Sequence, residues 1–348
     1  MSQVTAIALF SGGLDSILAC RVIMAQGIRV VALKFVTPFF DHHLLAREDA
    51  YRADIRRKYG IGVRLVDLSN GYVELVANPP HGYGKHFNPC IDCKIFMLRR
   101  ARAIMAEQGA SFLVSGEVLG QRPMSQRLDT LRLIERESGC AGILLRPLCA
   151  RRLPATEPEL AGLVQRTGLH AMSGRGRKGQ IQLAAQFGIS EYPSPAGGCM
   201  LTDPNLGSRI AGLYQEREQV AGSAPRPSDI RLLLVGRQFR LPGSHWFVLG
   251  RNEGENEQIA ALANEDDWLL TMVTRPGPTG LLRRARQPSA GSPGEEELAA
   301  LAAGLVVRYG RKVGGRRGAA DVLLIRDGEQ CTLTAAPLSD ETFANWLR

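Results

Sequence analysis

The chain has 348 residues, with 43 Lys and Arg against 34 Asp and Glu, a formal net charge of +9. This length favours two domains, because single hydrophobic cores stop growing at roughly 250–300 residues. No run of about 18 apolar residues appears, and no basic stretch precedes the first apolar run, which argues against a membrane span or signal peptide and predicts a cytoplasmic protein. The excess of cations favours a polyanionic partner, since Lys and Arg on phosphates release counterions.

The first half of the chain alternates apolar runs of strand length with amphipathic segments. Strands are predicted at 4–10, 29–36, 63–68 and 111–117, and helices at 14–26, 47–60 and 90–109. This β-α-β-α-β order is typical of an α/β fold, a parallel sheet with helices on both faces.

The second half has a different texture. Small and polar residues dominate from Gly207 to Ser228, and short β-like runs follow. The predicted elements are strands at 231–236, 245–250 and 320–327, a helix around 256–265, and a surface loop at 289–297. We therefore expect an α/β domain over 1–206, a linker over 207–228 and a smaller α+β domain over 229–348.

A loop of small residues, Ser11-Gly12-Gly13-Leu14-Asp15-Ser16, joins the first predicted strand to the first predicted helix. Bare backbone N–H groups at a helix N-terminus favour phosphate. Asp15 would repel a phosphate unless a Mg²⁺ ion lay between them. The alternative is a plain glycine turn in which Asp15 caps the helix.

Directly after a first strand, this loop resembles the pyrophosphate-binding signature of PP-loop ATPases, which cleave ATP between its α- and β-phosphates. The resemblance implies an adenine nucleotide alpha hydrolase-like fold that binds ATP and Mg²⁺ and adenylates a carbonyl oxygen, with Asp15 as a catalytic residue. The residues expected to bind the nucleotide in this part of the chain are Ser11, Gly12, Gly13, Asp15, Ser16 and Phe35.

Two further segments resemble tRNA-thiolating members of this class. Ser115 to Gln121, followed by Ser125-Gln126, is similar to the strand-end motif of tRNA 4-thiouridine synthetases. That resemblance assigns Gly116, Glu117 and Gln121 to the nucleotide site, the alternative being a polar turn after a buried strand. Asn88 to Cys93 is similar to the Asn-Pro-Cys segment of tRNA 2-thiouridylases, in which a cysteine at a helix start handles sulfur.

Seven cysteines, an odd number, argue against a disulfide framework. Cys90 and Cys93 lie in the first turn of a predicted helix, where the helix N-terminus favours thiolates. Cys199 follows a turn of small residues at 194–198, whereas Cys20 has the spacing of a core residue. We expect Cys90, Cys93 and Cys199 to be catalytic.

Two sulfur chemistries stay open for these three cysteines. In one they ligate a [4Fe–4S] cluster with an open iron, as their resemblance to iron–sulfur-dependent tRNA thiolases implies. In the other, Cys199 carries a persulfide that Cys90 or Cys93 resolves. Structural zinc usually has four protein ligands, and no histidine completes such a set. Buried cysteines without function are the remaining alternative.

Basic segments suggest where RNA would bind. The loop 173–180 contains Arg175, Arg177 and Lys178 and either contacts phosphates or is merely solvated. Residues 230–348 resemble the RNA-binding module of NFACT-type proteins through 248–252 and 275–279. The cations that fit this role are Arg283, Arg284, Arg286, Arg308, Arg311, Lys312, Arg316 and Arg317. The first strand begins at residue 4, so we expect this module to replace the N-terminal RNA-binding domain of 4-thiouridine synthetases.

The sequence thus predicts ATP-dependent tRNA thiolation, in which a uridine carbonyl oxygen is adenylated and sulfur then gives thiouridine. The expected partners are tRNA and a sulfur donor, either sulfide or a cysteine desulfurase relay, with no membrane and with a homodimer left open. The alternatives are a PP-loop sulfur transferase acting on a small molecule or carrier, and a non-catalytic RNA-binding protein.

Overall fold

The fold is a computed structural model that describes residues 3–194, 199–221, 225–283 and 293–347. The chain divides into two compact units, Met1–Pro227 (unit 1) and Ser228–Arg348 (unit 2). No helix among the described residues is long and apolar enough to cross a membrane.

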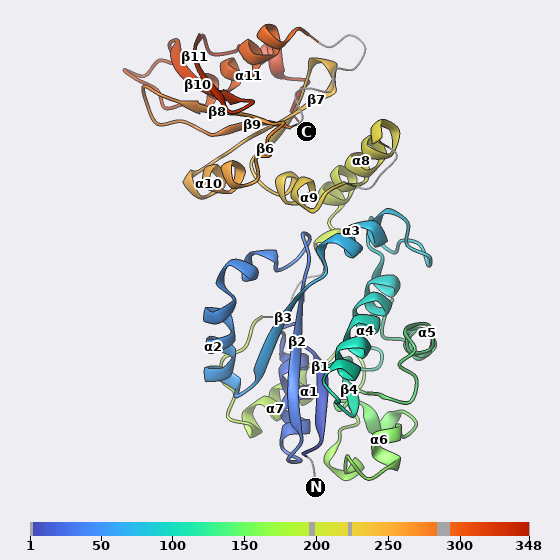
Figure 1. The fold of residues 1–348 in the computed structure, drawn as a ribbon. Coiled ribbons are helices and arrows are strands. Elements are labelled where there is room, and N and C mark those ends of the chain that lie inside the picture. The colour runs from blue at the N-terminus through green and yellow to red at the C-terminus, as the bar shows by residue number, and fades with distance from the viewer. Residues whose placement is uncertain (1–2, 195–198, 222–224, 284–292, 348) are drawn as a thin grey trace. The chain divides into compact units, whose positions relative to one another are not determined.

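Unit 1 is built on a parallel sheet (Figure 1), and the predicted fold class is confirmed. Its strands, in spatial order, are β3 (Gly62–Asp67), β2 (Arg29–Val36), β1 (Thr5–Leu9), β4 (Phe112–Val114) and β5 (Leu144–Leu145). All four neighbouring pairs are parallel, and Ala6 of β1 pairs with Val30 on one side and Phe112 on the other. Sites in such sheets form at the carboxyl ends of the strands.

Helices cover both faces of this sheet. They are α1 (Leu14–Met24), α2 (Glu48–Tyr59), α3 (Ser69–Ala77), α4 (Cys90–Glu107), α5 (Leu128–Ser138), α6 (Glu157–Leu160), α7 (Lys178–Gln186) and α8 (Pro204–Ala221). Helix α1 packs on β2 and α7, while α4 packs on β1, β4 and α5. Short 3₁₀ turns follow β2, β5, α6 and Cys199, at His42–Arg47, Ala150–Arg152, Arg166–Gly168 and Met200–Thr202.

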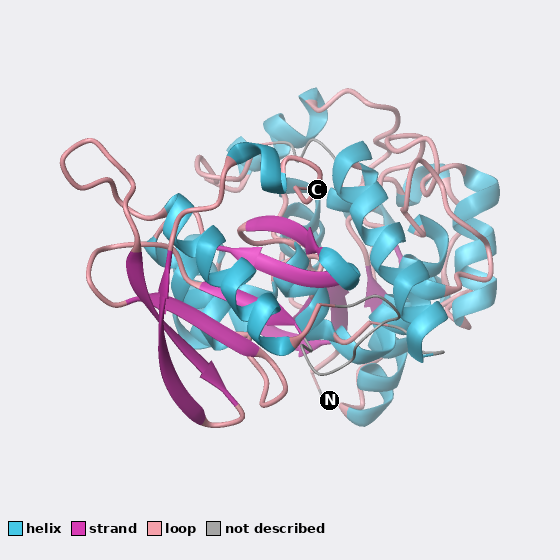
Figure 2. Ribbon diagram, turned by 90° about the horizontal axis from the view of Figure 1, so that it is seen from above, coloured by secondary structure: helices cyan, strands magenta, loops and turns pink. Residues whose placement is uncertain are grey.

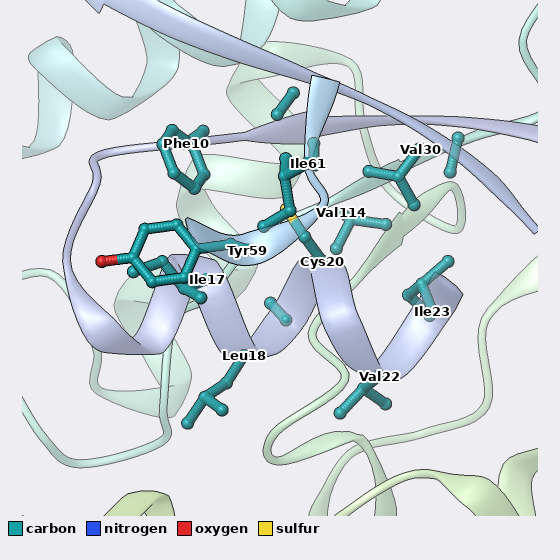
Figure 3. Packing of buried hydrophobic residues seen from close by; sticks show 14 of the residues in the cluster. Phe10, Ile17, Leu18, Cys20, Val22, Ile23, Val30, Tyr59, Ile61 and Val114 are labelled. Carbon is teal, nitrogen blue, oxygen red and sulfur yellow. The ribbon is translucent and has the colours of Figure 1, made fainter. Parts of the chain in front are cut away.

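The core under α1 forms because β1 and β2 are apolar at nearly every position and α1 is apolar almost all round. Ile17, Leu18 and Ile23 of α1 are fully buried in one cluster with Val30 of β2, and Leu18 points to the side of α1 away from Val30 (Figure 3). Cys20 lies in the same cluster with no exposed surface, which confirms its predicted place in the core.

Unit 2 is an antiparallel sheet covered by the long helix α11 (Figure 2). The sheet order is β11 (Glu329–Ala335), β10 (Ala320–Arg326), β8 (Trp268–Met272), β9 (Gly280–Arg283), β7 (His245–Leu249) and β6 (Arg237–Leu241). The helices are α9 (Pro227–Leu233), α10 (Glu253–Ala261), α11 (Glu295–Tyr309) and α12 (Asp340–Phe343), and one 3₁₀ turn spans Pro242–Ser244. Leu298, Ala302 and Leu305 put one apolar stripe of α11 into the core.

The region between the units differs from its sequence-based prediction. Helix α8 occupies most of the segment expected to be a linker, because Ile210, Leu213 and Tyr214 recur at helical spacing and are buried. The strand predicted at 231–236 is wrong: α9 runs to Leu233, and β6 begins only at Arg237. Short apolar runs do not distinguish a buried helix from a strand, and Pro227 favoured a helix start.

Candidate nucleotide and sulfur site

The glycine loop lies at the carboxyl end of β1, where it leads into α1. Gly12 has a φ of 86°, a conformation that glycine adopts without strain. Gly13 caps the helix, and the Ser16 hydroxyl donates to the Gly13 carbonyl at 2.8 Å and lies 3.2 Å from the Ser11 hydroxyl. The loop therefore gathers hydroxyl groups at a helix N-terminus, an arrangement suited to an anion.

Asp15 meets the strand-end motif directly. The Gln121 Nε2 donates to Asp15 Oδ2 at 3.0 Å. A Cβ at Gly116 would lie 2.6 Å from the Asp15 backbone carbonyl, so only glycine allows this approach. The other oxygen of Asp15, Oδ1, is buried and has no hydrogen-bond partner among the described residues. A buried carboxylate oxygen without a partner fits a hard cation such as Mg²⁺.

Lys34 is a residue of this site that the sequence analysis missed. It lies on β2 with 5% of its surface exposed, and its Nζ donates to the Ser11 carbonyl at 2.7 Å and to Asp41 at 2.5 Å. A cation inside the otherwise apolar run 30–36 was the available signal, since buried lysines are rare. The next residue, Phe35, is buried on the opposite face of the sheet, because successive side chains of a strand alternate.

Glu117 is the centre of a buried ion network. Its carboxylate contacts Lys94 of α4 at 3.1 Å and Arg146 at 3.0 Å, and Arg146 also pairs with Glu135. Burial would raise the pKa of Glu117, but Lys94 and Arg146 outweigh it and hold the pKa at about 2. Arg146 is 2% exposed, so its charge lies inside this network and not on the surface. The Glu117 side chain thus joins the strand-end motif to α4, the cysteine helix, which begins at Cys90 and includes Cys93.

The three predicted cysteines gather around the start of α4. The Asn88 amide donates to the Cys90 sulfur at 3.1 Å, and the buried Tyr72 hydroxyl hydrogen-bonds to the Cys93 thiol. Cys93 interacts electrostatically with both Cys90 and Cys199. The structure therefore brings residues from distant parts of the sequence within electrostatic range of one another.

Burial is the main influence on the protonation of two of these thiols, Cys93 and Cys199. Burial raises the pKa of Cys93 to about 12. It also raises the pKa of Cys199, where the neighbouring Cys90 acts in the same direction and the cation Arg122 lowers the pKa. The expectation that the helix start stabilises thiolates is therefore wrong for Cys93, because desolvation outweighs the helix dipole.

The described residues contain no three-membered group of His, Cys, Asp or Glu already arranged as a metal site. Three neighbouring thiols are nevertheless the donor set that an iron–sulfur cluster takes, and metal binding would displace their protons. Residues 195–198 of the predicted turn before Cys199 lie outside the described part of the chain.

The basic loop 173–180 is attached to the same edge of unit 1. The Gly174 N–H donates to the Leu119 carbonyl at 2.8 Å, two residues after Glu117. Arg175 and Lys178 are exposed on this loop. Its cations are thus fixed beside the strand-end motif.

The cations predicted to bind RNA in unit 2 fall into different groups. Arg283 is 4% exposed and pairs with Asp229 and Asp267, so its expected RNA contact is wrong. Arg308 pairs with Asp340 at 2.6 Å. The exposed members of the set are Arg311, Lys312 and Arg316, and Arg284 and Arg286 lie outside the described residues.

The two segments of unit 2 that resemble the NFACT-type module, 248–252 and 275–279, are joined by hydrogen bonds. The Gly250 N–H donates to the Thr279 carbonyl at 3.0 Å, and the Thr279 N–H donates to Asn256 Oδ1 at 2.9 Å. The Asn252 side chain caps α10 by accepting from the Glu255 N–H at 3.0 Å. These hydrogen bonds help to build the fold of unit 2, with Thr279 buried and Asn252 exposed.

Comparison with known proteins gives relatives for both units. Residues 1–152 match the family described as thiamine biosynthesis protein (ThiI), and residues 236–347 match the NFACT protein RNA binding domain. A tRNA sulfurtransferase of Sodalis glossinidius is 34% identical over 151 residues, which are 42% of this chain and 29% of that protein. A probable tRNA sulfurtransferase of Thermus thermophilus is 30% identical over 170 residues, 48% of this chain and 39% of that protein.

These matches cover well under half of each relative's length. A solved 4-thiouridine synthetase–RNA complex with bound ATP aligns with 63% of this chain and 54% of its own, at 19% identity and a TM-score of 0.34. That score is too low to support an argument, so the fold assignment depends on the strand order described above. The chain joins a unit similar to the ThiI family to a unit similar to the NFACT RNA binding domain.

Proposed function

We propose that this chain is an ATP-dependent tRNA sulfurtransferase that adenylates a uridine carbonyl oxygen and replaces it with sulfur. One observation carries the proposal: Gly116 packs on Asp15 of the glycine loop, while the adjacent Glu117 pairs with Lys94 beside Cys93. The nucleotide loop and the cysteine helix are therefore held together by two consecutive residues. The matched relatives that are named tRNA sulfurtransferases support the same chemistry.

The parts of the glycine loop fit adenylation. Ser11, Gly12, Gly13 and Ser16 would bind the pyrophosphate portion of ATP, and Asp15 would hold Mg²⁺ through its partnerless oxygen. Lys34 fixes the loop through the Ser11 carbonyl. Attack of the uridine oxygen on the α-phosphorus then forms the adenylate and releases pyrophosphate. Sulfur adds to the activated carbon, and AMP leaves.

Cys90, Cys93 and Cys199 would hold the donor-derived sulfur that replaces the uridine oxygen. They would ligate a [4Fe–4S] cluster, which, when bound, provides an open iron for an exogenous sulfide. The second candidate needs no metal: a Cys199 persulfide attacks the adenylated carbon, and Cys90 or Cys93 then frees the product by forming a disulfide, which an external thiol must reduce. The proximity of the three sulfurs supports both routes.

Basic surfaces on both units would hold tRNA. In unit 1 the exposed cations of the loop 173–180 lie beside the strand-end motif, and in unit 2 Arg311, Lys312 and Arg316 are exposed. Contacts of this kind neutralise phosphates without reading sequence.

ATP–pyrophosphate exchange with and without bulk tRNA tests the proposal. We expect exchange that depends on tRNA, together with thiouridine in the recovered nucleosides by mass spectrometry. Exchange that is indifferent to tRNA would indicate a small substrate or carrier. Binding of tRNA without any exchange would leave only a non-catalytic RNA-binding protein.

Cysteine variants purified without oxygen separate the two sulfur routes. With a cluster, the protein should contain about four irons and four sulfides, and Cys90→Ala, Cys93→Ala or Cys199→Ala should lose both iron and thiolation. Cys20→Ala, a change in the core, is the matched control and should lose neither. Thiolation by an iron-free, colourless protein would leave the persulfide route.

A further inference from the structure

A rigid, exposed aromatic ring precedes the cysteine helix. Tyr83 lies in the loop 79–89, which we call the aromatic loop, and 40% of its surface is exposed. Its hydroxyl donates to the Val76 carbonyl at 2.6 Å, and its ring stacks on Phe87 with centroids 4.5 Å apart and planes 19° apart. An aromatic side chain that is fixed at its tip and on one face, yet exposed, resembles a binding surface more than a core residue.

The ring has firm support. Phe87 packs against Tyr214 of α8 with centroids 5.5 Å apart, and the Tyr214 hydroxyl donates to the Val73 carbonyl of α3 at 2.8 Å. The three rings therefore connect the aromatic loop to two helices of unit 1. A platform that is already ordered loses little conformational entropy when a flat group stacks on it.

The platform lies close to the sulfur chemistry. The Gly84 N–H donates to the Asn88 carbonyl at 2.8 Å, and the Asn88 amide contacts the Cys90 sulfur at 3.1 Å. This closed loop brings Tyr83 back toward Cys90. Met124 packs over Gly84, where an added Cβ would lie 2.1 Å from the methionine methyl group.

Exposed positive charge surrounds the same place. Lys85 is exposed on the aromatic loop, and Arg122 is exposed beside Met124. Arg122 directly follows Gln121, whose side chain donates to Asp15 of the glycine loop. An open aromatic ring with neighbouring cations suits an unpaired nucleotide, whose base stacks while its phosphates meet the charges.

We propose that Tyr83 is the stacking platform for an unpaired base of the RNA substrate, with Lys85 and Arg122 on the adjoining phosphates. This inference rests on the proposed function and specifies how the substrate approaches Cys90. Enzymes that modify a base must take it out of the helical stack, and an aromatic face compensates for the lost stacking.

Replacing Tyr83 tests the platform. Tyr83→Leu removes the ring, and the KM for tRNA in thiolation should rise about 5- to 100-fold, in keeping with about 1–3 kcal/mol per stacked base. Tyr83→Phe keeps the ring and should stay near wild type. Leu160→Ser on α6, a change at another exposed apolar side chain (77% exposed), is the control and should leave KM unchanged. ATP affinity should be the same in all variants.

Photocrosslinking makes the test independent of variant folding. Wild-type protein irradiated with tRNA that carries 5-bromouridine at the modified position should be crosslinked in the peptide that contains Tyr83. Crosslinks confined to other peptides, or a normal tRNA KM for folded Tyr83→Leu, would overturn the inference while leaving thiolation by the wild type intact. If the Tyr83 variants slowed only the loading of sulfur onto the enzyme, that result would also overturn the inference, and it would indicate that Tyr83 contacts a protein partner. Absence of thiolation by the wild type would instead contradict the proposed function.

Discussion

The two units of this chain bury charge in opposite arrangements. In unit 1 a carboxylate, Glu117, lies between the cations Lys94 and Arg146. In unit 2 a cation, Arg283, lies between Asp229 and Asp267. The three residues of the unit 2 network are at most 5% exposed, whereas the side chain of Lys94 in unit 1 is 29% exposed.

The difference indicates different roles. The unit 2 network ties β9 to α9 and to the turn before β8 and reaches no surface, so it acts as a structural anchor. The unit 1 network begins beside Cys93 and passes through Glu117. The neighbouring Gly116 packs on Asp15 of the glycine loop. Buried charge by itself therefore does not mark a functional site. What distinguishes the unit 1 network is its contact with the glycine loop, where Asp15 Oδ1 is buried without a hydrogen-bond partner.

The largest expected effect is at Asp15. Asp15→Ala removes the proposed Mg²⁺ ligand, and AMP formation should fall at least about a hundredfold, because metal stabilisation is worth several kcal/mol. The melting temperature should change little. The control is Asp49→Ala, at a fully exposed side chain of α2. Full AMP production by Asp15→Ala would contradict the assignment of the glycine loop.

Arg283→Met tests the anchor in unit 2. Removing the cation leaves Asp229 and Asp267 buried beside each other, and the free energy of unfolding of unit 2 should fall by about 3–5 kcal/mol. All three tryptophans, Trp246, Trp268 and Trp346, lie in unit 2, so tryptophan fluorescence reports its unfolding selectively.

Arg308→Met is the matched control for that change, because its partner Asp340 has a side chain that is 74% exposed. It should cost no more than about 1 kcal/mol. Equal effects of the two substitutions would remove the distinction between an anchor and a surface pair.

Glu117→Gln tests the unit 1 network through pH. The pKa of Glu117 in the folded state is about 2, below the ordinary value of 4.5, so its contribution is complete above pH 4.5 and is lost as the pH falls toward 2. This loss amounts to about 3 kcal/mol. Acid titration of the unfolding free energy should show a shallower slope in the variant.

Asp129→Asn is the control for this titration. The pKa of Asp129 is also lowered, chiefly by the backbone N–H of Thr130, but the side chain is exposed, so solvent screens its contribution. A wild-type acid slope in Glu117→Gln would show that the network does not stabilise unit 1 in this way.

The smallest expected effect separates the two basic surfaces. Replacing Arg311, Lys312 and Arg316 together with Gln should weaken tRNA binding and reduce the slope of log affinity against log salt by about 2–3. The matching double change Arg175→Gln and Lys178→Gln addresses unit 1. If only the unit 1 change altered the slope, unit 2 would need a role other than phosphate binding.

The sequence by itself determined the place of the glycine loop and the order of elements in unit 1. The boundaries of β2 were predicted to the residue, and the glycine loop was placed between β1 and α1, because apolar runs and small-residue turns are local signals. It also identified Cys20 as a core residue from helical spacing alone. In unit 2 the same local reasoning misplaced 231–236, where a short apolar run carries no period.

Only the tertiary structure decided which polar residues work together. No local pattern distinguishes Arg283 and Arg146, which are buried in ion networks, from the exposed Arg311 and Arg316. Lys34 and Tyr72 join the site because the sheet and α3 bring them to Ser11 and Cys93 across many residues of chain. Burial and charge partners set the pKa of a side chain and decide whether it can reach a ligand. Both are properties of the packed chain, and the sequence does not reveal them before the strands are ordered.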